Sequence, residues 1–135
     1  MKKLKNILLV DDDIATNFIN KKIINDSHCA EHVDAVTSGK AALDYLVSKT
    51  ENLDQPELIF LDINMPAMNG WEFLEEYKKL KDSQKAKIII VMLTTSLNPD
   101  DYDKAKEIPE IDDFKNKPLN NQAIEDIMTK YFPES

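Results

Sequence analysis

Short runs of aliphatic residues recur along this 135-residue chain, and their spacing is the main constraint on its fold. The clearest runs are Ile7–Val10, Leu58–Leu61 and Ile88–Leu93, and weaker ones lie at Val33–Val36 and around Phe114. Runs that do not alternate between polar and apolar residues are typical of strands buried on both faces, as in a parallel sheet covered by helices. We therefore predict that these segments are strands of one buried sheet.

Segments with helical spacing follow the runs. In the first segment the apolar positions are Ile14, Phe18, Ile19, Ile23 and Ile24, which is the spacing of an amphipathic helix. Further helices are predicted after Ser38 as an N-cap, after the Asn69–Gly70 turn, over Pro99–Lys106, and along the stripe from Ile124 to Tyr131. Strand and helix thus alternate five times, which predicts an α/β fold: a doubly wound, five-stranded parallel sheet with five helices that cover both faces.

No repeat, low-complexity tract or linker interrupts this alternation. The length suits one domain and is too short for two comfortable ones, so a single domain over residues 1–135 is expected. The charge balance is acidic, with 17 Lys and Arg against 25 Asp and Glu and a net charge of −8. Such a surface repels phosphate backbones, which argues against a nucleic-acid partner.

Cysteine usage and hydropathy bear on the compartment. The single cysteine, Cys29, cannot form an internal disulfide, and together with His28 and His32 it cannot supply a cysteine–histidine metal cluster. The apolar run after the basic N-terminus is too short for the core of a signal peptide, and no run approaches the ~18 apolar residues of a membrane span. We expect a cytoplasmic protein with no membrane partner.

Glycine is scarce, and this excludes two common phosphate-binding loops. The chain has two glycines, Gly39 and Gly70, which lie far apart, whereas nucleotide-binding loops need clustered glycines that bring backbone amides against phosphate. Any phosphate chemistry must therefore use side chains.

Polar residues follow the predicted strands, at the sheet edge where an open parallel sheet places its site. These residues are Asp11, Asp12 and Asp13 after the first strand, Asp62 after the third, Thr94 after the fourth and Lys117 after the last. Carboxylates brought together would repel one another and raise one another's pKa values, and a divalent cation would remove the repulsion. Hard oxygen ligands select Mg²⁺ or Mn²⁺.

The lysine and the threonine add groups that can bind phosphoryl oxygens. Lys117 would act as a point charge and the Thr94 hydroxyl as a donor, while a carboxylate that attacks phosphorus in line forms an acyl phosphate. Each residue alone has an ordinary explanation, such as a helix cap for Asp11–Asp13, a turn residue for Asp62 or a surface lysine for Lys117. Their convergence favours a phosphoryl-transfer site.

Four motifs in this order resemble the receiver domain of two-component response regulators. The motifs are Ile7-Leu8-Leu9-Val10-Asp11-Asp12, then Leu61-Asp62-Ile63-Asn64-Met65-Pro66 running on to Asn69-Gly70, then Leu93-Thr94-Thr95-Ser96, and last Phe114-Lys115-Asn116-Lys117-Pro118. The resemblance covers essentially the whole chain. It implies a chemotaxis-regulator-like, flavodoxin-like fold with strand order 2-1-3-4-5. We expect no output domain in this chain, which would be either a stand-alone response regulator or a receiver excised from a longer protein.

The resemblance also implies roles for the carboxylates. Asp62 would be the phosphoacceptor, which takes a phosphoryl group from a sensor histidine kinase or a histidine phosphotransfer protein. Asp12 would bind Mg²⁺ directly and Asp11 mainly through metal-bound water, with Asp62 and the backbone carbonyl of Asn64 completing the site. The protein would be a signalling protein that catalyses its own phosphorylation and dephosphorylation, rather than an enzyme with a free substrate.

The remaining roles concern switching. Thr94 would be the switch hydroxyl, Lys117 would pair with the phosphoryl group, and the bond to Pro118 would be cis. Phe114 falls where the family has its aromatic switch residue, but it lacks a hydroxyl. Thr95 stands where many relatives have alanine, so we expect slow to moderate self-dephosphorylation.

Output in such proteins is binding through a surface that phosphorylation alters. The resemblance implies a surface around the fourth and fifth helices, which here includes the charged segment Asp100–Lys106 and which would contact an unknown downstream protein. The chain would be a monomer or a phosphorylation-dependent dimer.

Three other interpretations remain open at this point. One is a pseudo-receiver that binds partners without phosphate. Another is a phosphohydrolase similar to the haloacid-dehalogenase family, since Asp11 and Asp13 with Thr16 fit its motif; the nucleophile would be Asp13 there and Asp62 in a receiver. A flavin-binding flavodoxin-like protein is disfavoured, because the three aspartates after the first strand would repel phosphate.

Overall fold

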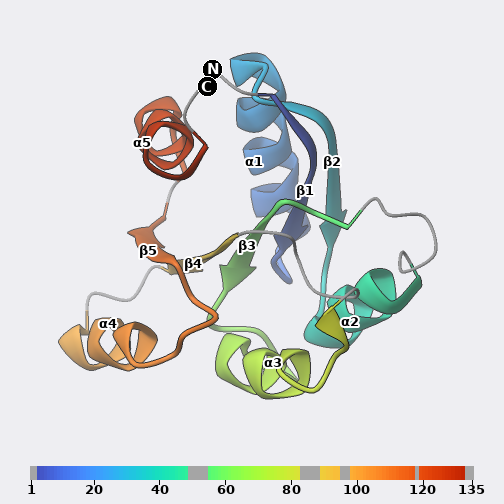
Figure 1. The fold of residues 1–135 in the computed structure, drawn as a ribbon, viewed down its shortest axis with the longest axis vertical. Coiled ribbons are helices and arrows are strands. Elements are labelled where there is room, and N and C mark those ends of the chain that lie inside the picture. Colours follow the sequence, from blue (N-terminus) through green and yellow to red (C-terminus); the bar gives the residue numbers. More distant parts are fainter. Residues whose placement is uncertain (1–2, 49–54, 83–88, 95–97, 118, 133–135) are drawn as a thin grey trace.

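A parallel sheet forms the centre of the computed structural model, which describes residues 3–48, 55–82, 89–94, 98–117 and 119–132 (Figure 1). In these parts of the chain the sheet has five strands: β1 (Leu4–Val10), β2 (Ala30–Val36), β3 (Leu58–Asp62), β4 (Ile89–Thr94) and β5 (Asp113–Asn116). Their order is β2-β1-β3-β4-β5, and every neighbouring pair is parallel.

Helices cover both faces of this sheet (Figure 1). Those of the described residues are α1 (Ile14–Ser27), α2 (Gly39–Ser48), α3 (Gly70–Tyr77), α4 (Pro99–Lys106) and α5 (Asn121–Tyr131). Buried side chains of α1 and α5 share one core cluster, while those of α2, α3 and α4 share the other. The predicted α/β class, with a parallel sheet between two helical layers, is confirmed.

Side-chain caps explain where most of the helices begin. The side chains of Asp13, Asn69, Asn98 and Asn120 each accept a hydrogen bond from a backbone N–H in the first turn of α1, α3, α4 and α5. At α2, the backbone N–H of Ala41 donates to Ser38 Oγ at 3.0 Å. A capping side chain satisfies one of the N–H groups that a helix start leaves unpaired.

Burial on both faces of the sheet explains why the sequences of the central strands are almost wholly apolar. Along β1, Ile7 and Leu9 belong to the core on the side of α1 and α5, whereas Leu8 and Val10 belong to the core on the other side. Successive side chains of a strand point to opposite faces, so a strand covered on both faces needs apolar residues at every position. The predicted run Ile7–Val10 is the buried end of a strand that begins three residues earlier, at Leu4.

Helix α1 forms as its spacing predicts, but part of its apolar side faces solvent. Ile14, Phe18 and Ile19 are 74%, 71% and 54% exposed. The buried residues of α1 are instead Asn17, Asn20 and Ile24. The reason lies at the start of the helix, where the Asp13 cap and the hydrogen bonds of Asn17 set its rotation about its own axis.

The helices of the described residues lack what a membrane-spanning helix requires. None of them combines the length and the apolar character that a membrane span requires.

Candidate functional site

The carboxyl ends of the inner strands bring the predicted site residues to one edge of the sheet. Asp11 directly follows β1, and Asp62 is the last residue of β3. Asp62 is paired with Leu93 in β4, and the next residue, Thr94, is paired with Asn116 in β5. Parallel strands therefore bring the ends of these segments side by side at this edge.

Three of the predicted metal ligands form a carboxylate cluster. Asp11, Asp12 and Asp62 each offer one carboxylate oxygen, and these oxygens all lie within 4.8 Å of one another. Asp11 and Asp62 are only 4% and 5% exposed, whereas Asp12 faces solvent. Two buried carboxylates at such a separation repel strongly and need a positive partner.

Lys117 supplies a positive partner from β5's carboxyl end. Its Nζ donates to Asp11 Oδ2 at 2.6 Å and lies 3.3 Å from Asp62 Oδ1. The lysine side chain is 16% exposed and both aspartate side chains are 6% exposed. The ion pairs are therefore largely buried, and salt screens buried charges much less than exposed ones.

The electrostatic environment shifts the pKa values of both Asp62 and Lys117. Burial and the charge of Asp11 raise the pKa of Asp62, although Lys117 opposes the rise. Burial acts to lower the pKa of Lys117, but its hydrogen bond to Asp11 and the charges of Asp62 and Asp11 outweigh burial and raise the pKa. Lys117 thus stays charged, while a second positive charge near Asp62 would further favour its ionised form.

Backbone amides hold the two buried carboxylates in place. The N–H of Asp13 donates to Asp11 Oδ1 at 2.9 Å, which leaves Asp11 Oδ2 for the lysine. The N–H of Asn64 donates to Asp62 Oδ1 at 3.3 Å. The loop that carries Asn64 is closed by Gly70, whose N–H donates to Ile63 O at 2.8 Å.

Asp13 has a different task from its neighbours. Its carboxylate accepts hydrogen bonds from Thr16 Oγ1 at 2.9 Å and from the N–H of Ala15 at 3.0 Å, as the N-cap of α1. The bond from Thr16, followed by that from Ala15, lowers the pKa of Asp13. Asp13, which would be the nucleophile of a haloacid-dehalogenase motif, is therefore engaged in capping a helix.

Several predicted features cannot be placed at this site. The side chain of Thr94 lies outside the described part of the chain, as do Thr95, Ser96 and Pro118. The switch hydroxyl, the cis bond and the effect of Thr95 on dephosphorylation therefore stay predictions.

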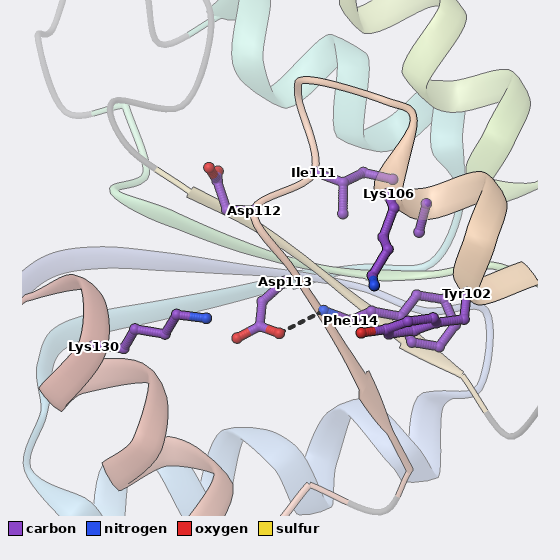
Figure 2. A pocket seen from close by; sticks show the side chains of 8 residues that line it. Tyr102, Lys106, Ile111, Asp112, Asp113, Phe114 and Lys130 are labelled. Carbon is purple, nitrogen blue, oxygen red and sulfur yellow. Dashed lines mark hydrogen bonds between the residues drawn. The ribbon is translucent and has the colours of Figure 1, made fainter.

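Phe114 lies on β5, between α4 and α5 (Figure 2). Its ring packs edge-on against Tyr102 of α4, with centroids 5.6 Å apart and planes at 87°. Both rings line a cavity of about 220 Å³, and Lys106 Nζ lies 4.6 Å from the centre of the Tyr102 ring. Figure 2 shows Asp113 and Lys130 on the other side of this cavity. The sequence placed Tyr102 on the output surface but gave no sign of its contact with Phe114.

Asn17 is a residue near the site that the sequence did not single out. It is buried on α1, and its Nδ2 donates to Asp11 O at 2.8 Å. Its only signal in the sequence is an amide among apolar residues of a helix, which resembles an ordinary surface position.

A family model and a curated relative identify the family. The model for the response regulator receiver domain matches residues 7–129. The chain is 35% identical over 106 residues to response regulator Rcp1 from Synechocystis sp., which is 77% of this chain and 71% of Rcp1. The chain therefore belongs to the response regulator receiver domain family.

Further similarities agree with this assignment. The crystal structure of a two-component response regulator from Cytophaga hutchinsonii superimposes with a TM-score of 0.90 at 37% identity, and the match covers 98% of this chain and all of that one. Sporulation initiation phosphotransferase F from Bacillus subtilis is 27% identical over 129 residues, or 96% of this chain and 94% of that protein. Other curated relatives are longer, and the chain spans 23%, 7% and 52% of three of them.

Proposed function

We propose that this receiver-family chain is a phosphoacceptor in a two-component phosphorelay. It takes a phosphoryl group on Asp62 from a histidine of a sensor kinase or of a histidine phosphotransfer protein, and the change alters a protein-binding surface. The observation that carries this proposal is the pairing of buried Asp62 with Lys117 inside a cluster of carboxylates. That arrangement combines a nucleophile with a cation that can receive phosphoryl oxygens.

The donor set of the site fits Mg²⁺, with Mn²⁺ as a possible substitute. Asp11, Asp12 and Asp62 present hard carboxylate oxygens within 4.8 Å of one another, and we propose the carbonyl of Asn64 as a further ligand. When bound, the ion would supply positive charge that offsets the carboxylates and the charge of the transferring phosphoryl group.

The proposed reaction uses the chain's own side chains in defined roles. An oxygen of Asp62 attacks phosphorus in line, the new P–O bond forms as the P–N bond of phosphohistidine breaks, and the electron pair of that bond stays on the imidazole. Lys117, already 3.3 Å from Asp62 Oδ1, binds one phosphoryl oxygen, and the Thr94 hydroxyl binds another. Attack of water on the acyl phosphate later releases inorganic phosphate and restores the Asp62 carboxylate.

Helix α1 supports a protein as the phosphoryl donor. Ile14 follows the Asp13 cap directly, so the exposed apolar side chains of Ile14, Phe18 and Ile19 begin at the rim of the carboxylate cluster. Exposed apolar side chains that gather on one helix are typical of interaction surfaces. We propose that a helix of the donor, carrying apolar residues beside its phosphohistidine, packs against this face of α1.

The Phe114 region supports an output through α4, β5 and α5. Phe114 and Tyr102 pack together beside a cavity of about 220 Å³, so the ring of Phe114 has room to change its position. A change at this contact would alter the surface of α4 that a downstream protein binds.

Intact-mass spectrometry after incubation with acetyl phosphate tests the acceptor role. We expect a gain of one phosphoryl group that requires Mg²⁺ and that Asp62→Asn abolishes. Asp13→Asn is the matched control, since asparagine also caps helices and Asp13 lies outside the carboxylate cluster. A gain that survives in Asp62→Asn but not in Asp13→Asn would support the phosphohydrolase instead, and no gain from acetyl phosphate or a phosphorylated kinase would indicate a pseudo-receiver.

A second comparison tests the donor surface. We expect Phe18→Ser to leave the reaction with acetyl phosphate unchanged and to slow transfer from a phosphorylated histidine kinase, because a small donor does not need α1. Equal rates with both donors would remove α1 from the proposal and leave the acceptor role intact.

A further inference from the structure

Asn17 joins the ends of two strands next to the carboxylate cluster. The residue is 5% exposed, and its Nδ2 donates to Asp11 O at 2.8 Å and to Val36 O at 3.3 Å. Asp11 follows β1 and Val36 ends β2, so one amide group connects both strands to the first turns of α1.

The orientation of this amide follows from its partners. Both partners are carbonyl oxygens, which only accept hydrogen bonds, so the NH₂ group of Asn17 must face them. Its Oδ1 is buried and has no hydrogen-bond partner among the described residues. A buried polar atom without a partner lowers stability, and a position that keeps one calls for an explanation.

The hydrogen bonds of Asn17 act on Asp11 through the backbone. The carbonyl of Asp11 is held by Asn17, and its N–H donates to Val36 O at 3.2 Å. With both peptide groups fixed, the Cα–Cβ bond of Asp11 has a set direction. The N–H of Asp13 and the Nζ of Lys117 then hold the carboxylate, with Oδ2 2.6 Å from Nζ. The same turn carries Asp12, whose carboxylate forms no hydrogen bond or ion pair within the described part of the chain but belongs to the 4.8 Å cluster.

We propose that Asn17 is a positioning residue for the metal site: it holds the turn between β1 and α1 so that the carboxylates of Asp11 and Asp12 face Asp62. This rests on the proposed function, in which those carboxylates bind Mg²⁺. Asn17 does not touch the ion or the phosphoryl group, and it acts through the Asp11 backbone. Burying Oδ1 without a partner lowers stability, and the chain keeps this amide because the site requires its NH₂ donor.

Mg²⁺ titration followed by the backbone amide shifts of residues 11–13 in NMR spectra tests this role. Asn17→Leu keeps the size and removes the donor. Asn20→Leu is the matched control, since Asn20 is also buried on α1, at 4% exposed, but lies three residues farther from the acidic turn. We expect the Mg²⁺ dissociation constant to rise about tenfold in Asn17→Leu, as when groups that orient metal ligands are lost, and to stay close to the parent value in Asn20→Leu.

Urea unfolding in EDTA separates positioning from a general structural role. A merely structural Asn17 would change the free energy of unfolding and leave the Mg²⁺ affinity of the folded protein unchanged. An unchanged dissociation constant in Asn17→Leu, or an equal rise in Asn20→Leu, would overturn the proposal. Asn17→Ala removes the same donor without added bulk and decides the question if the leucine variant does not fold. If the parent itself shows no response to Mg²⁺, the proposed metal site fails, which is a different result from a parent that binds and a variant that binds equally well.

Discussion

Replacing Lys117 with methionine takes the positive charge away from two buried carboxylates while it keeps most of the side-chain volume. The Nζ lies 2.6 Å from Asp11 Oδ2 and 3.3 Å from Asp62 Oδ1, and both aspartates are almost fully buried. Lys117→Met should therefore destabilise the protein in the absence of a divalent cation, because each carboxylate keeps its charge and loses its partner.

The size of this effect follows from the separations. At an effective dielectric constant of about 20, the two ion pairs attract by about 6 and 5 kcal/mol. Much of this attraction is offset by the cost of burying the lysine charge, so that losing one partner of a buried ion pair costs about 3–5 kcal/mol. Lys117 keeps 16% of its side chain exposed, and water that enters the site would moderate the repulsion. We expect a loss of about 3 kcal/mol in the free energy of unfolding.

Urea unfolding at pH 7 in EDTA measures this loss. Lys115→Met is the matched control, since Lys115 lies two residues earlier, on β5, is 29% exposed and approaches Asp113 only to 4.0 Å. This substitution should cost less than about 1 kcal/mol. The loss in Lys117→Met should shrink in excess Mg²⁺, which stabilises a folded state that binds it. It should also shrink toward pH 4, because the unpaired carboxylates bind protons more tightly in the folded state than in the unfolded chain.

Two results would refute this reasoning. One is a loss in Lys117→Met no larger than that in Lys115→Met. The other is a loss that is the same with and without Mg²⁺ and at every pH, since packing alone would then account for it. Adding Asp62→Asn to Lys117→Met should recover part of the stability, because the double variant has one fewer carboxylate in the cluster.

Three further predictions concern stability. Burial and the charge of Asp11 raise the pKa of Asp62. In EDTA the protein should therefore lose stability as pH rises above about 4, where that carboxyl ionises in the unfolded chain. Asp62→Asn should then be more stable than the parent by about 1 kcal/mol in urea unfolding at pH 7. Asn6 is only 4% exposed, and its Nδ2 donates to the Tyr45 hydroxyl at 2.7 Å. Tyr45→Phe removes this acceptor and should lower the free energy of unfolding by about 1–3 kcal/mol in the same assay. Asn69→Ala breaks the capping box with Glu72 and should cost about 1 kcal/mol, with the loss visible as faster amide exchange in α3.

The sheet could be predicted from the sequence because its central strands are buried on both faces. Burial of this kind leaves an aliphatic run, as in Leu58–Leu61, that few other structures produce. The positions of Asp11, Asp62 and Lys117 followed from the same step, since the ends of parallel strands converge whatever the detailed packing. The sequence could not show that Lys117 lies closer to Asp11 than to Asp62, because that depends on side-chain geometry across the sheet edge.

The rotation of helix α1 about its own axis could not be predicted in the same way, because it depends on contacts that are distant in sequence. Asn17 reaches Val36 of β2, nineteen residues farther along the chain, and this contact turns Phe18 to solvent. Spacing alone treats Phe18 as part of a buried stripe and Asn17 as part of a polar face. Helix α1 therefore buries a polar residue and exposes an apolar one, against what its local sequence pattern indicates. Such disagreement is typical of functional elements.

The charges at the site both lower the stability of the folded protein and support the proposed chemistry. When all are ionised, the carboxylates of Asp11, Asp12 and Asp62 and the ammonium of Lys117 sum to 1 − 3 = −2. A monovalent cation would leave part of this charge uncompensated, whereas a divalent cation matches it, which is why the donor set favours Mg²⁺ over Na⁺ or K⁺. Because Lys117 Nζ lies closer to Asp11 Oδ2 than to Asp62 Oδ1, at 2.6 Å against 3.3 Å, a cation that compensates Asp11 would free the ammonium for a phosphoryl oxygen on Asp62. We therefore expect metal binding and the reorientation of Lys117 to be coupled, so that Lys117→Met should bind Mg²⁺ more tightly than the parent.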